Sequence, residues 1–279
     1  MPNYRKQRRH QNEKIMKKCS WLDTFFVQYI DIKENEMGKY EFIFWDVDQT
    51  LLDFIKSEDY SLRYTFEQFE RKIDTETVLL YSQINDSYWK RLEKGEISKQ
   101  EVLYGRFRTL FEKLGIQDIQ LEEFASLYQR ALGSVYFFQD DSYKLCEELS
   151  REYRQFVVTN GVTQTQLNKL ELSGLDRLME DVFISETIGV PKPNKVFFEK
   201  CFEKIPGFQK EKAIIIGDSL TSDMQGGNNA GIDCCWYNPG KKEKNPDIRI
   251  DYEICNLWEI KDILNGKIRK SENEIIVSD

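Results

Sequence analysis

Two carboxylates, Asp46 and Asp48, directly follow the unbroken apolar run Phe42 to Trp45. Side chains two residues apart in an extended chain point the same way, so both carboxylates can reach one small volume beyond a strand. Carboxylates at that separation repel each other unless a cation lies between them, and oxygen ligands of this kind favour Mg²⁺. Because Asp-x-Asp also occurs in ordinary turns, the pair indicates a metal-dependent site only if other segments support it.

Candidate phosphate-binding residues lie in two later segments of the chain. The hydroxyl of Thr159 and the main-chain amides of Asn160 and Gly161 can cradle phosphate oxygens. Lys192 stands between two prolines that restrict its backbone, so it can present a fixed positive charge to the same phosphate. The alternatives are a Thr159 that only caps a helix and a Lys192 that is a solvated loop lysine.

Two more carboxylates, Asp218 and Asp223, follow the apolar run Ala213 to Gly217. Asp218 is a candidate metal ligand in addition to Asp46 and Asp48. Asp223 is a candidate supporting residue, which would orient metal-bound waters or the lysine of the preceding segment. Together these segments supply carboxylates, a lysine and phosphate-binding amides, a set suited to metal-assisted chemistry on a phosphate.

Short apolar strands alternate with helices after residue 141, and this alternation predicts a parallel sheet with right-handed crossovers. Ligands gather at the carboxyl ends of such strands, where the polar segments above stand. The expected fold class is therefore α/β, with a Rossmann-like parallel sheet. Thr163 with Gln166 predicts a capping box at the start of one helix. The expected strands are 42–45, 155–159, 181–185, 213–217 and 232–237, and the expected helices between them are 142–152, 163–173, 194–204 and 222–230.

A helical segment is expected between the first strand and the rest of the sheet. From residue 57 to about residue 133, apolar residues recur at spacings of three and four with few breakers, which predicts four helices. Ser98 with Glu101 predicts a capping box that starts one of them, and Gly115 is its expected stop. An all-helical insertion directly behind the first strand would lie above the site as a lid.

The N-terminal segment is rich in lysine and arginine, and an apolar segment follows it. Three interpretations stay open: an extension packed against the core, a basic arm for an anionic partner, or a natural start at Met37. The tail after residue 266 is expected to fray. The expected domains are an N-terminal extension (1–36), a catalytic core (37–56 and 140–266), a helical cap (57–139) and a C-terminal tail (267–279).

Composition excludes several classes of function. The net charge of −8 argues against a nucleic-acid polymer as partner, because polyanion binding needs a basic face. No apolar run of about 18 residues and no signal-peptide pattern is present, so a cytoplasmic protein without a membrane partner is expected. The single histidine, His10, argues against a histidine base or a histidine-rich zinc centre. The six cysteines lack Cys-x-x-Cys spacing and are expected to be buried thiols.

In order and spacing, the polar segments resemble the four motifs of the haloacid dehalogenase (HAD) superfamily. The resemblance covers residues 40–265, and four short motifs in the right order are far more specific than any one of them. It implies a Rossmann-like core with an inserted all-helical cap, Mg²⁺ as cofactor, and hydrolysis of a phosphate ester. The four segments are residues 46–50, 158–161, 190–194 and 217–223, the last followed by the glycine-rich residues 226–231.

The resemblance also implies a role for each residue. Asp46 would be the nucleophile that forms an aspartyl-phosphate, and Asp48 would be the general acid and then the general base. Mg²⁺ would be held by the carboxylates of Asp46 and Asp218 and by the main-chain carbonyl of Asp48. A second carboxylate at position 48 disfavours cleavage of a carbon–halogen bond. The phosphate would be bound by Thr159, Asn160, Gly161 and Lys192, with Asp223 in support.

Residues 42–54, 85–105 and 185–194 further resemble the pyrimidine 5′-nucleotidase branch, whose members remove phosphate from nucleoside monophosphates. Gln49 departs from the glycine or acidic residue often found there, and its side chain is expected to point away from phosphate. In the cap, several residues are candidates for a surface that stacks on a base, with Arg106 as a polar handle. These aromatic residues are Tyr81, Tyr88, Trp89, Tyr104 and Phe107; each is also consistent with a place in the cap interior.

Three functions stay open at this stage. The first is a Mg²⁺-dependent nucleotidase. The second is a phosphatase for another small ester, such as a sugar phosphate or phosphoglycolate, with a phosphomutase as a remoter variant. The third is a non-catalytic phosphate-binding module, against which the presence of both Asp46 and Asp48 argues, since such a module needs neither a nucleophile nor an acid. Oligomeric state is not predicted.

Overall fold

The computed structural model describes residues 39–268 and residue 270. The expected extension, residues 1–36, lies outside the described residues, as does most of the expected tail, so both remain predictions. Within the described part of the chain, no helix is long and apolar enough to cross a membrane.

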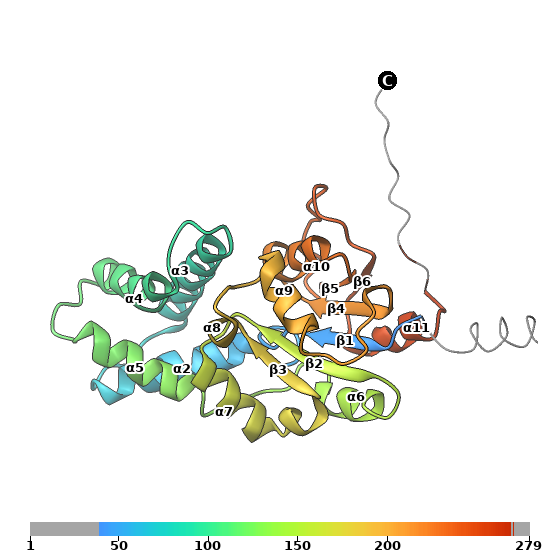
Figure 1. Cartoon of the computed structure of the whole chain (residues 1–279). Coiled ribbons are helices and arrows are strands. Elements are labelled where there is room, and N and C mark those ends of the chain that lie inside the picture. Colours follow the sequence, from blue (N-terminus) through green and yellow to red (C-terminus); the bar gives the residue numbers. More distant parts are fainter. Residues whose placement is uncertain (1–38, 269, 271–279) are drawn as a thin grey trace, which may run out of the picture. The chain divides into compact units, whose positions relative to one another are not determined.

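Six parallel strands form one sheet in the order β3-β2-β1-β4-β5-β6 (Figure 1). The first strand lies between β2 and β4, with Trp45 opposite both Val157 and Ile216. The central strands are runs of aromatic and β-branched residues that are buried throughout, as expected for parallel strands covered on both faces. The bounds are β1 Phe42–Trp45, β2 Arg154–Thr159, β3 Asp181–Ile184, β4 Ala213–Gly217, β5 Asp233–Tyr237 and β6 Tyr252–Ile254.

Helices cover both faces of this sheet, with α9 and α10 above it and α6 and α7 below it in Figure 1. Alternate residues of β1 point to opposite faces, so Ile43 and Trp45 pack with α6, α7 and α11. Phe42 and Phe44 pack with α9 and α10 on the other face. The bounds are α6 Ser142–Leu149, α7 Thr163–Ser173, α8 Ser185–Ile188, α9 Lys195–Phe202, the π-helical turn η3 Leu220–Met224, α10 Gln225–Ala230 and α11 Ile260–Leu264.

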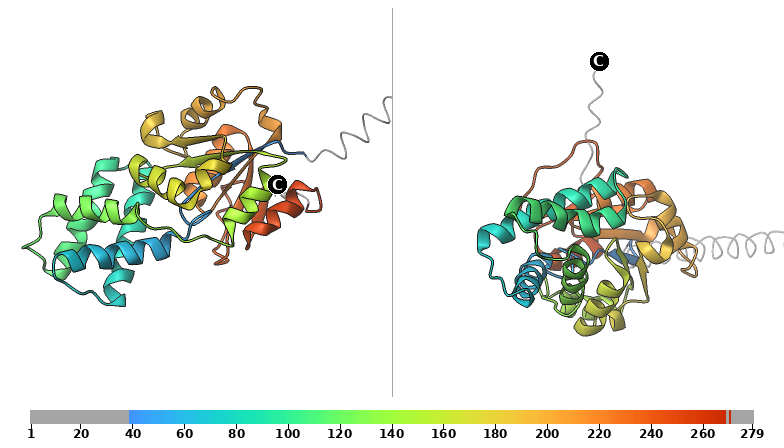
Figure 2. Two further views of the ribbon diagram at one scale, coloured as in Figure 1. Left: turned by 90° about the horizontal axis from the view of Figure 1, so that it is seen from below. Right: turned by 90° about the vertical axis from the view of Figure 1, so that its left-hand side faces the viewer.

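Four helices between β1 and α6 pack side by side (Figure 2) and share a hydrophobic cluster of their own. Ser98 caps α4 by accepting a hydrogen bond from Glu101 N at 3.2 Å, and Gly115 ends the helix with φ +67°. A separate interior supports the expected division into core and cap, which stays a prediction. We call these four helices the cap: α2 Phe54–Gln68, α3 Thr75–Glu93, α4 Lys99–Leu114 and α5 Leu121–Leu132.

The α/β fold and its parallel sheet are confirmed, and each expected strand is present within a residue at either end. β6 was not expected, because three residues are too short for a periodic signal. The expected helix 222–230 is divided between η3 and α10. Of the described cysteines, four are buried as expected, but Cys255 is exposed, because it stands in the turn between β6 and the last helical segment.

The capping box expected from Thr163 and Gln166 is wrong. Val162 is the residue before α7 and makes no side-chain cap. The Thr163 hydroxyl instead donates to Glu186 at 2.7 Å, and the Gln166 amide donates to Asp48 at 2.6 Å. Tertiary partners from two other segments therefore outcompete the local hydrogen bonds that the sequence suggests.

Candidate active site

Asp46 lies at the carboxyl end of β1, in the centre of the sheet. Its main-chain N–H donates to Ile216 O of β4 at 2.9 Å, so it continues the ladder by one residue beyond the strand. The residue is only 8% exposed. Because β2 and β4 flank β1, Thr159, the last residue of β2, and Asp218, the residue after β4, lie on either side of Asp46. The three segments therefore share one edge, as the sequence predicts.

Lys192 is buried directly beside Asp46. Its Nζ donates to Asp46 Oδ1 at 2.8 Å, to Asp223 Oδ1 at 2.7 Å and to Val158 O at 2.7 Å, so all three ammonium protons are used. Burial opposes the charging of Lys192, but the carboxylates of Asp223 and Asp46 outweigh it and raise its pKa. The geometry therefore fixes a permanent positive charge on one side of Asp46.

The side chain of Asn160 holds the segment that carries Lys192. Its Oδ1 accepts from Lys192 N at 2.9 Å, and its Nδ2 donates to Lys192 O at 2.9 Å and to Ser222 Oγ at 3.3 Å. Sequence reasoning assigned only the main-chain amide of Asn160 to the site. The paired hydrogen bonds show that this side chain also ties together three of the four motif segments.

Three carboxylates gather at this edge. Ligand atoms of Asp46, Asp218 and Asp223 lie within 4.8 Å of one another. Burial raises the pKa of Asp46, and Asp223 and Asp218 add to the rise against the opposing effect of Lys192. Burial and the neighbouring Asp223 likewise raise the pKa of Asp218 to about 7. Hard oxygen donors crowded beyond what one lysine neutralises fit a divalent cation such as Mg²⁺.

The Asp48 carboxylate lies outside that carboxylate group. Lys169 Nζ donates to its Oδ1 at 2.6 Å and Gln166 Nε2 donates to its Oδ2 at 2.6 Å. Sequence reasoning missed both donors, although their spacing of three residues in an expected helix places them on one face. Gln49, next in the chain, turns its side chain to Ile55 N at 3.0 Å, which agrees with the expectation that it points away from phosphate.

The segment after β2 forms a tight loop at the same edge. Thr159 is 2% exposed, and its Oγ1 accepts from Gly161 N at 3.1 Å. The cap residue Lys99 donates from Nζ to the carbonyls of Asn160 and Gly161, both at 2.7 Å, and pairs with Glu186 at 3.1 Å. Sequence reasoning did not single out Lys99. Phosphate binding by this loop stays a prediction, and would require the Gly161 amide to exchange its partner.

A second cap residue reaches the site from the end of α3. Glu93 accepts a hydrogen bond from Thr221 of η3, three residues after Asp218. Burial raises the pKa of Glu93 to about 7, and the nearby Asp223 adds to the rise. The start of α4 and the end of α3 thus both contact the loops around the carboxylates.

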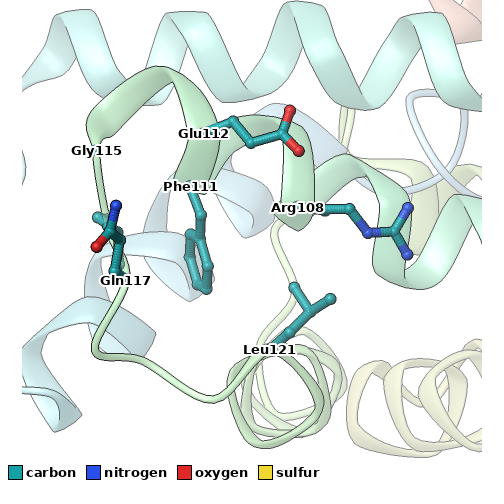
Figure 3. A pocket seen from close by; sticks show the side chains of 7 residues that line it. Arg108, Phe111, Glu112, Gly115, Gln117 and Leu121 are labelled. Carbon is teal, nitrogen blue, oxygen red and sulfur yellow. The ribbon is translucent and has the colours of Figure 1, made fainter.

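A depression of about 410 Å³ lies elsewhere, at the carboxyl end of α4 (Figure 3). It contains none of the motif residues, and Arg108 and Glu112 put opposite charges on its rim. We therefore assign it no part in the site. Its lining residues are Arg108, Phe111, Glu112, Gly115, Ile116, Gln117 and Leu121.

Comparison with known proteins agrees with this geometry. YfnB of Bacillus subtilis, named a HAD-hydrolase, is 39% identical over 82% of this chain and 97% of its own length. Pyrimidine 5′-nucleotidase PynA of Streptococcus pneumoniae is 39% identical over 82% of this chain and 97% of its own. Pyrimidine 5′-nucleotidase YjjG of Escherichia coli is 28% identical over 81% of this chain and 98% of its own.

Comparison with solved structures identifies the same group of proteins. A magnesium-bound crystal structure of YfnB superposes with a TM-score of 0.78 at 37% identity, over 81% of this chain and 99% of that one. The profile of the haloacid dehalogenase-like hydrolases matches residues 43–237, which begin in β1 and end with β5. The matched span contains every motif segment described above. The chain therefore belongs to the haloacid dehalogenase-like hydrolase family.

Proposed function

We propose that this enzyme is a Mg²⁺-dependent phosphomonoester hydrolase that works through an aspartyl-phosphate, and that it is a 5′-nucleotidase for pyrimidine nucleoside monophosphates. The observation that carries the chemistry is the buried contact of Lys192 with Asp46 at 2.8 Å, beside the group formed with Asp218 and Asp223. A nucleophilic carboxylate needs its negative charge offset when an anionic phosphate approaches. Lys192 supplies a fixed charge for this purpose.

The first half-reaction transfers the phosphoryl group to the enzyme. An oxygen of Asp46 attacks phosphorus, and the bond from phosphorus to the ester oxygen breaks with its electron pair on that oxygen. Asp48 gives a proton to the departing oxygen. The loop at Thr159 binds the phosphoryl oxygens. The ammonium of Lys192 offsets their negative charge, and must exchange one of its three present acceptors to donate to them. Mg²⁺ would be held by the carboxylates of Asp46 and Asp218 and by the main-chain carbonyl of Asp48, and would neutralise negative charge on the phosphoryl group.

The second half-reaction releases phosphate. Asp48, now ionised, takes a proton from water, whose oxygen attacks the phosphorus of the aspartyl-phosphate. The bond between phosphorus and the Asp46 oxygen breaks, which restores the Asp46 carboxylate and leaves Asp48 protonated for the next cycle. Asp48 must therefore face the same small volume in both steps.

Two observations support a nucleoside monophosphate as the substrate. Two of the similar proteins are named pyrimidine 5′-nucleotidases. In the cap, the half-buried ring of Trp89 lies 5.9 Å from Lys99 Nζ, and that ammonium bonds the loop carbonyls of Asn160 and Gly161. The Trp89 Nε1 donates to Asn85 at 3.1 Å, which fixes the plane of the ring. An aromatic face held near the phosphate loop suits a base.

Other cap residues considered for stacking fit less well. Tyr81 and Phe107 are fully buried and stack on each other at 5.3 Å between ring centroids. Arg106 is 1% exposed and donates to Asn85 Oδ1 at 2.6 Å. These three residues belong to the cap interior. Arg106 therefore acts on Trp89 through Asn85, whose oxygen accepts from both side chains.

A screen of phosphate release in magnesium buffer tests the proposal, with UMP and dTMP compared against glucose 6-phosphate and phosphoglycolate. Stacking is worth about 1 to 3 kcal/mol per base, so the specificity constant should favour the nucleotides by roughly tenfold to a hundredfold. Asp46→Asn should abolish release while the protein stays folded. Trp89→Ala should reduce the preference, whereas Tyr64→Ala, an exposed aromatic of the same cap, should not.

Each outcome of the screen is informative. Release from every ester at equal rates would leave the phosphatase chemistry standing and remove the nucleotidase. A preference for the sugar phosphate or phosphoglycolate would favour a phosphatase for another small ester. No release from any ester would favour a non-catalytic phosphate-binding module.

A further inference from the structure

Two side chains of α7 donate hydrogen bonds to both carboxylate oxygens of Asp48. Lys169 Nζ and Gln166 Nε2 each lie 2.6 Å from a different carboxylate oxygen. We propose that Gln166 and Lys169 are positioning residues that hold the Asp48 carboxylate in the direction needed for both proton transfers. This inference rests on the proposed phosphatase mechanism. The two α7 side chains would then affect the reaction through Asp48, without contacting substrate themselves.

The burial of Lys169 is hard to explain without such a part. Its side chain is 1% exposed, whereas that of Asp48 is 26% exposed. A buried ammonium costs free energy unless it is paired, and within the described part of the chain its ion-pair partner is Asp48. Its Nζ also lies 5.4 Å from the centre of the ring of Phe54, at the start of the first cap helix. An apolar residue would fill this place without needing a partner.

Gln166 is fitted equally closely to the phosphate loop. A Cβ added to Gly161 would lie 1.9 Å from Gln166 Nε2, so the amide rests directly on the loop backbone. Glycine at position 161 is therefore needed to let Gln166 reach Asp48. One α7 side chain thus links the loop that would bind phosphate to the residue that would move protons.

The two donors differ in what they can offer during the cycle. An ammonium only donates, so Lys169 fixes one oxygen of Asp48 as a hydrogen-bond acceptor. The Gln166 Oε1 has no hydrogen-bond partner among the described residues. Gln166 is neutral, and rotation of its amide by half a turn can present either a donor or an acceptor to Asp48. The pair therefore combines a fixed cationic donor with a neutral group that can reverse its direction.

The competing explanation is a buried ion pair that only stabilises the fold. Leaving groups separate the two explanations, because an alkoxide needs a proton to depart whereas p-nitrophenolate departs without one. A positioning role makes the loss depend on the leaving group. A loss of folded protein lowers the rate for every substrate by the same factor.

The experiment uses Lys169→Met and Gln166→Met, which keep side-chain size, in single-turnover reactions with dTMP and with p-nitrophenyl phosphate. Lys261→Met is the matched control, since Lys261 has an ion pair of 2.6 Å with Glu148 and lies 5.6 Å from an aromatic ring. Each proposed variant should slow phosphoryl transfer from dTMP about tenfold to a hundredfold, part of the usual contribution of a general acid. The control should leave both rates unchanged.

With p-nitrophenyl phosphate, the first turnover of either variant should be slowed less than about threefold. The second half-reaction still needs Asp48 as base, so with p-nitrophenyl phosphate in excess over enzyme a burst of p-nitrophenolate followed by a slow phase should appear. Equal slowing of both substrates, or no slowing of either, would overturn the positioning role. If wild-type enzyme released phosphate from no ester, the proposed function itself would fail, which is a different result from either of these.

Discussion

Replacing Lys192 by methionine removes one positive charge from between two buried carboxylates and keeps the length of the side chain. The ammonium lies 2.8 Å from Asp46 and 2.7 Å from Asp223, whose side chains are 12% and 1% exposed. Removing one partner of a buried ion pair typically costs about 3 to 5 kcal/mol, because the other charge is left without compensation. We expect the free energy of unfolding of Lys192→Met to fall by about this amount at pH 8 in magnesium-free buffer.

The loss should also depend on pH. Lys192 lowers the pKa of Asp46 against the effect of burial, so its removal raises the folded-state pKa of Asp46 further. A carboxyl whose folded-state pKa exceeds its unfolded value gives stability below the unfolded pKa that is lost as pH rises through the folded pKa. The deficit of the variant should therefore be small near pH 4 and grow toward pH 8.

Urea unfolding followed by circular dichroism measures the effect, with Lys200→Met as the control. Lys200 Nζ donates to a neutral acceptor, Ile188 O, at 2.9 Å, a bond worth about 0.5 to 1.5 kcal/mol. A loss for Lys192→Met no larger than that of the control would refute the reasoning. So would a larger loss that is the same at pH 4 and pH 8, because it would not arise from buried charge.

Three further substitutions test other parts of the site and cap. Asp48→Asn should lower kcat on dTMP by roughly 10² to 10⁴, measured at saturating substrate, and a loss below tenfold would contradict its role in proton transfer. Asp218→Asn should remove most of the magnesium-dependent rise in melting temperature, and a rise equal to that of wild type would exclude it as a ligand. Burial raises the pKa of Glu58 to about 7 from 4.5, so Glu58→Gln should be more stable than wild type at pH 8, by at most about 3 kcal/mol, and equal at pH 4; a gain at pH 4 would contradict this.

The place of the site could be predicted because it depends on topology. Asp46 and Thr159 each follow an apolar run, and parallel strands bring such ends to one edge whatever the details of packing. Lys192 follows no strand end of its own, and its burial against Asp46 depends on the hydrogen bonds of Asn160 to the main chain of its segment. Those bonds link residues 32 apart, and no local pattern reports them.

The cap contacts were beyond the sequence for a similar reason. Periodicity places Glu93 and Lys99 at the end and start of neighbouring helices, but not the direction in which that hairpin points. The contact of Glu93 with Thr221 and that of Lys99 with the loop carbonyls depend on how two separately packed parts meet. Neither helix propensity nor the spacing of apolar residues predicts that arrangement.

The helix α7 shows where a local pattern misleads for a chemical reason. Amphipathic spacing would turn leucines inward and polar residues outward, yet only Leu170 is buried, whereas Leu167 and Leu172 are 44% and 53% exposed. Gln166 and Lys169 are instead buried, 1% and 0% exposed, with both aimed at Asp48. Exposed leucines and buried polar groups each weaken a helix that only has to pack. Polar side chains buried in a helix that follows a motif loop are therefore candidates for contacts with the site, and this signal can be sought in a sequence once the loop has been recognised.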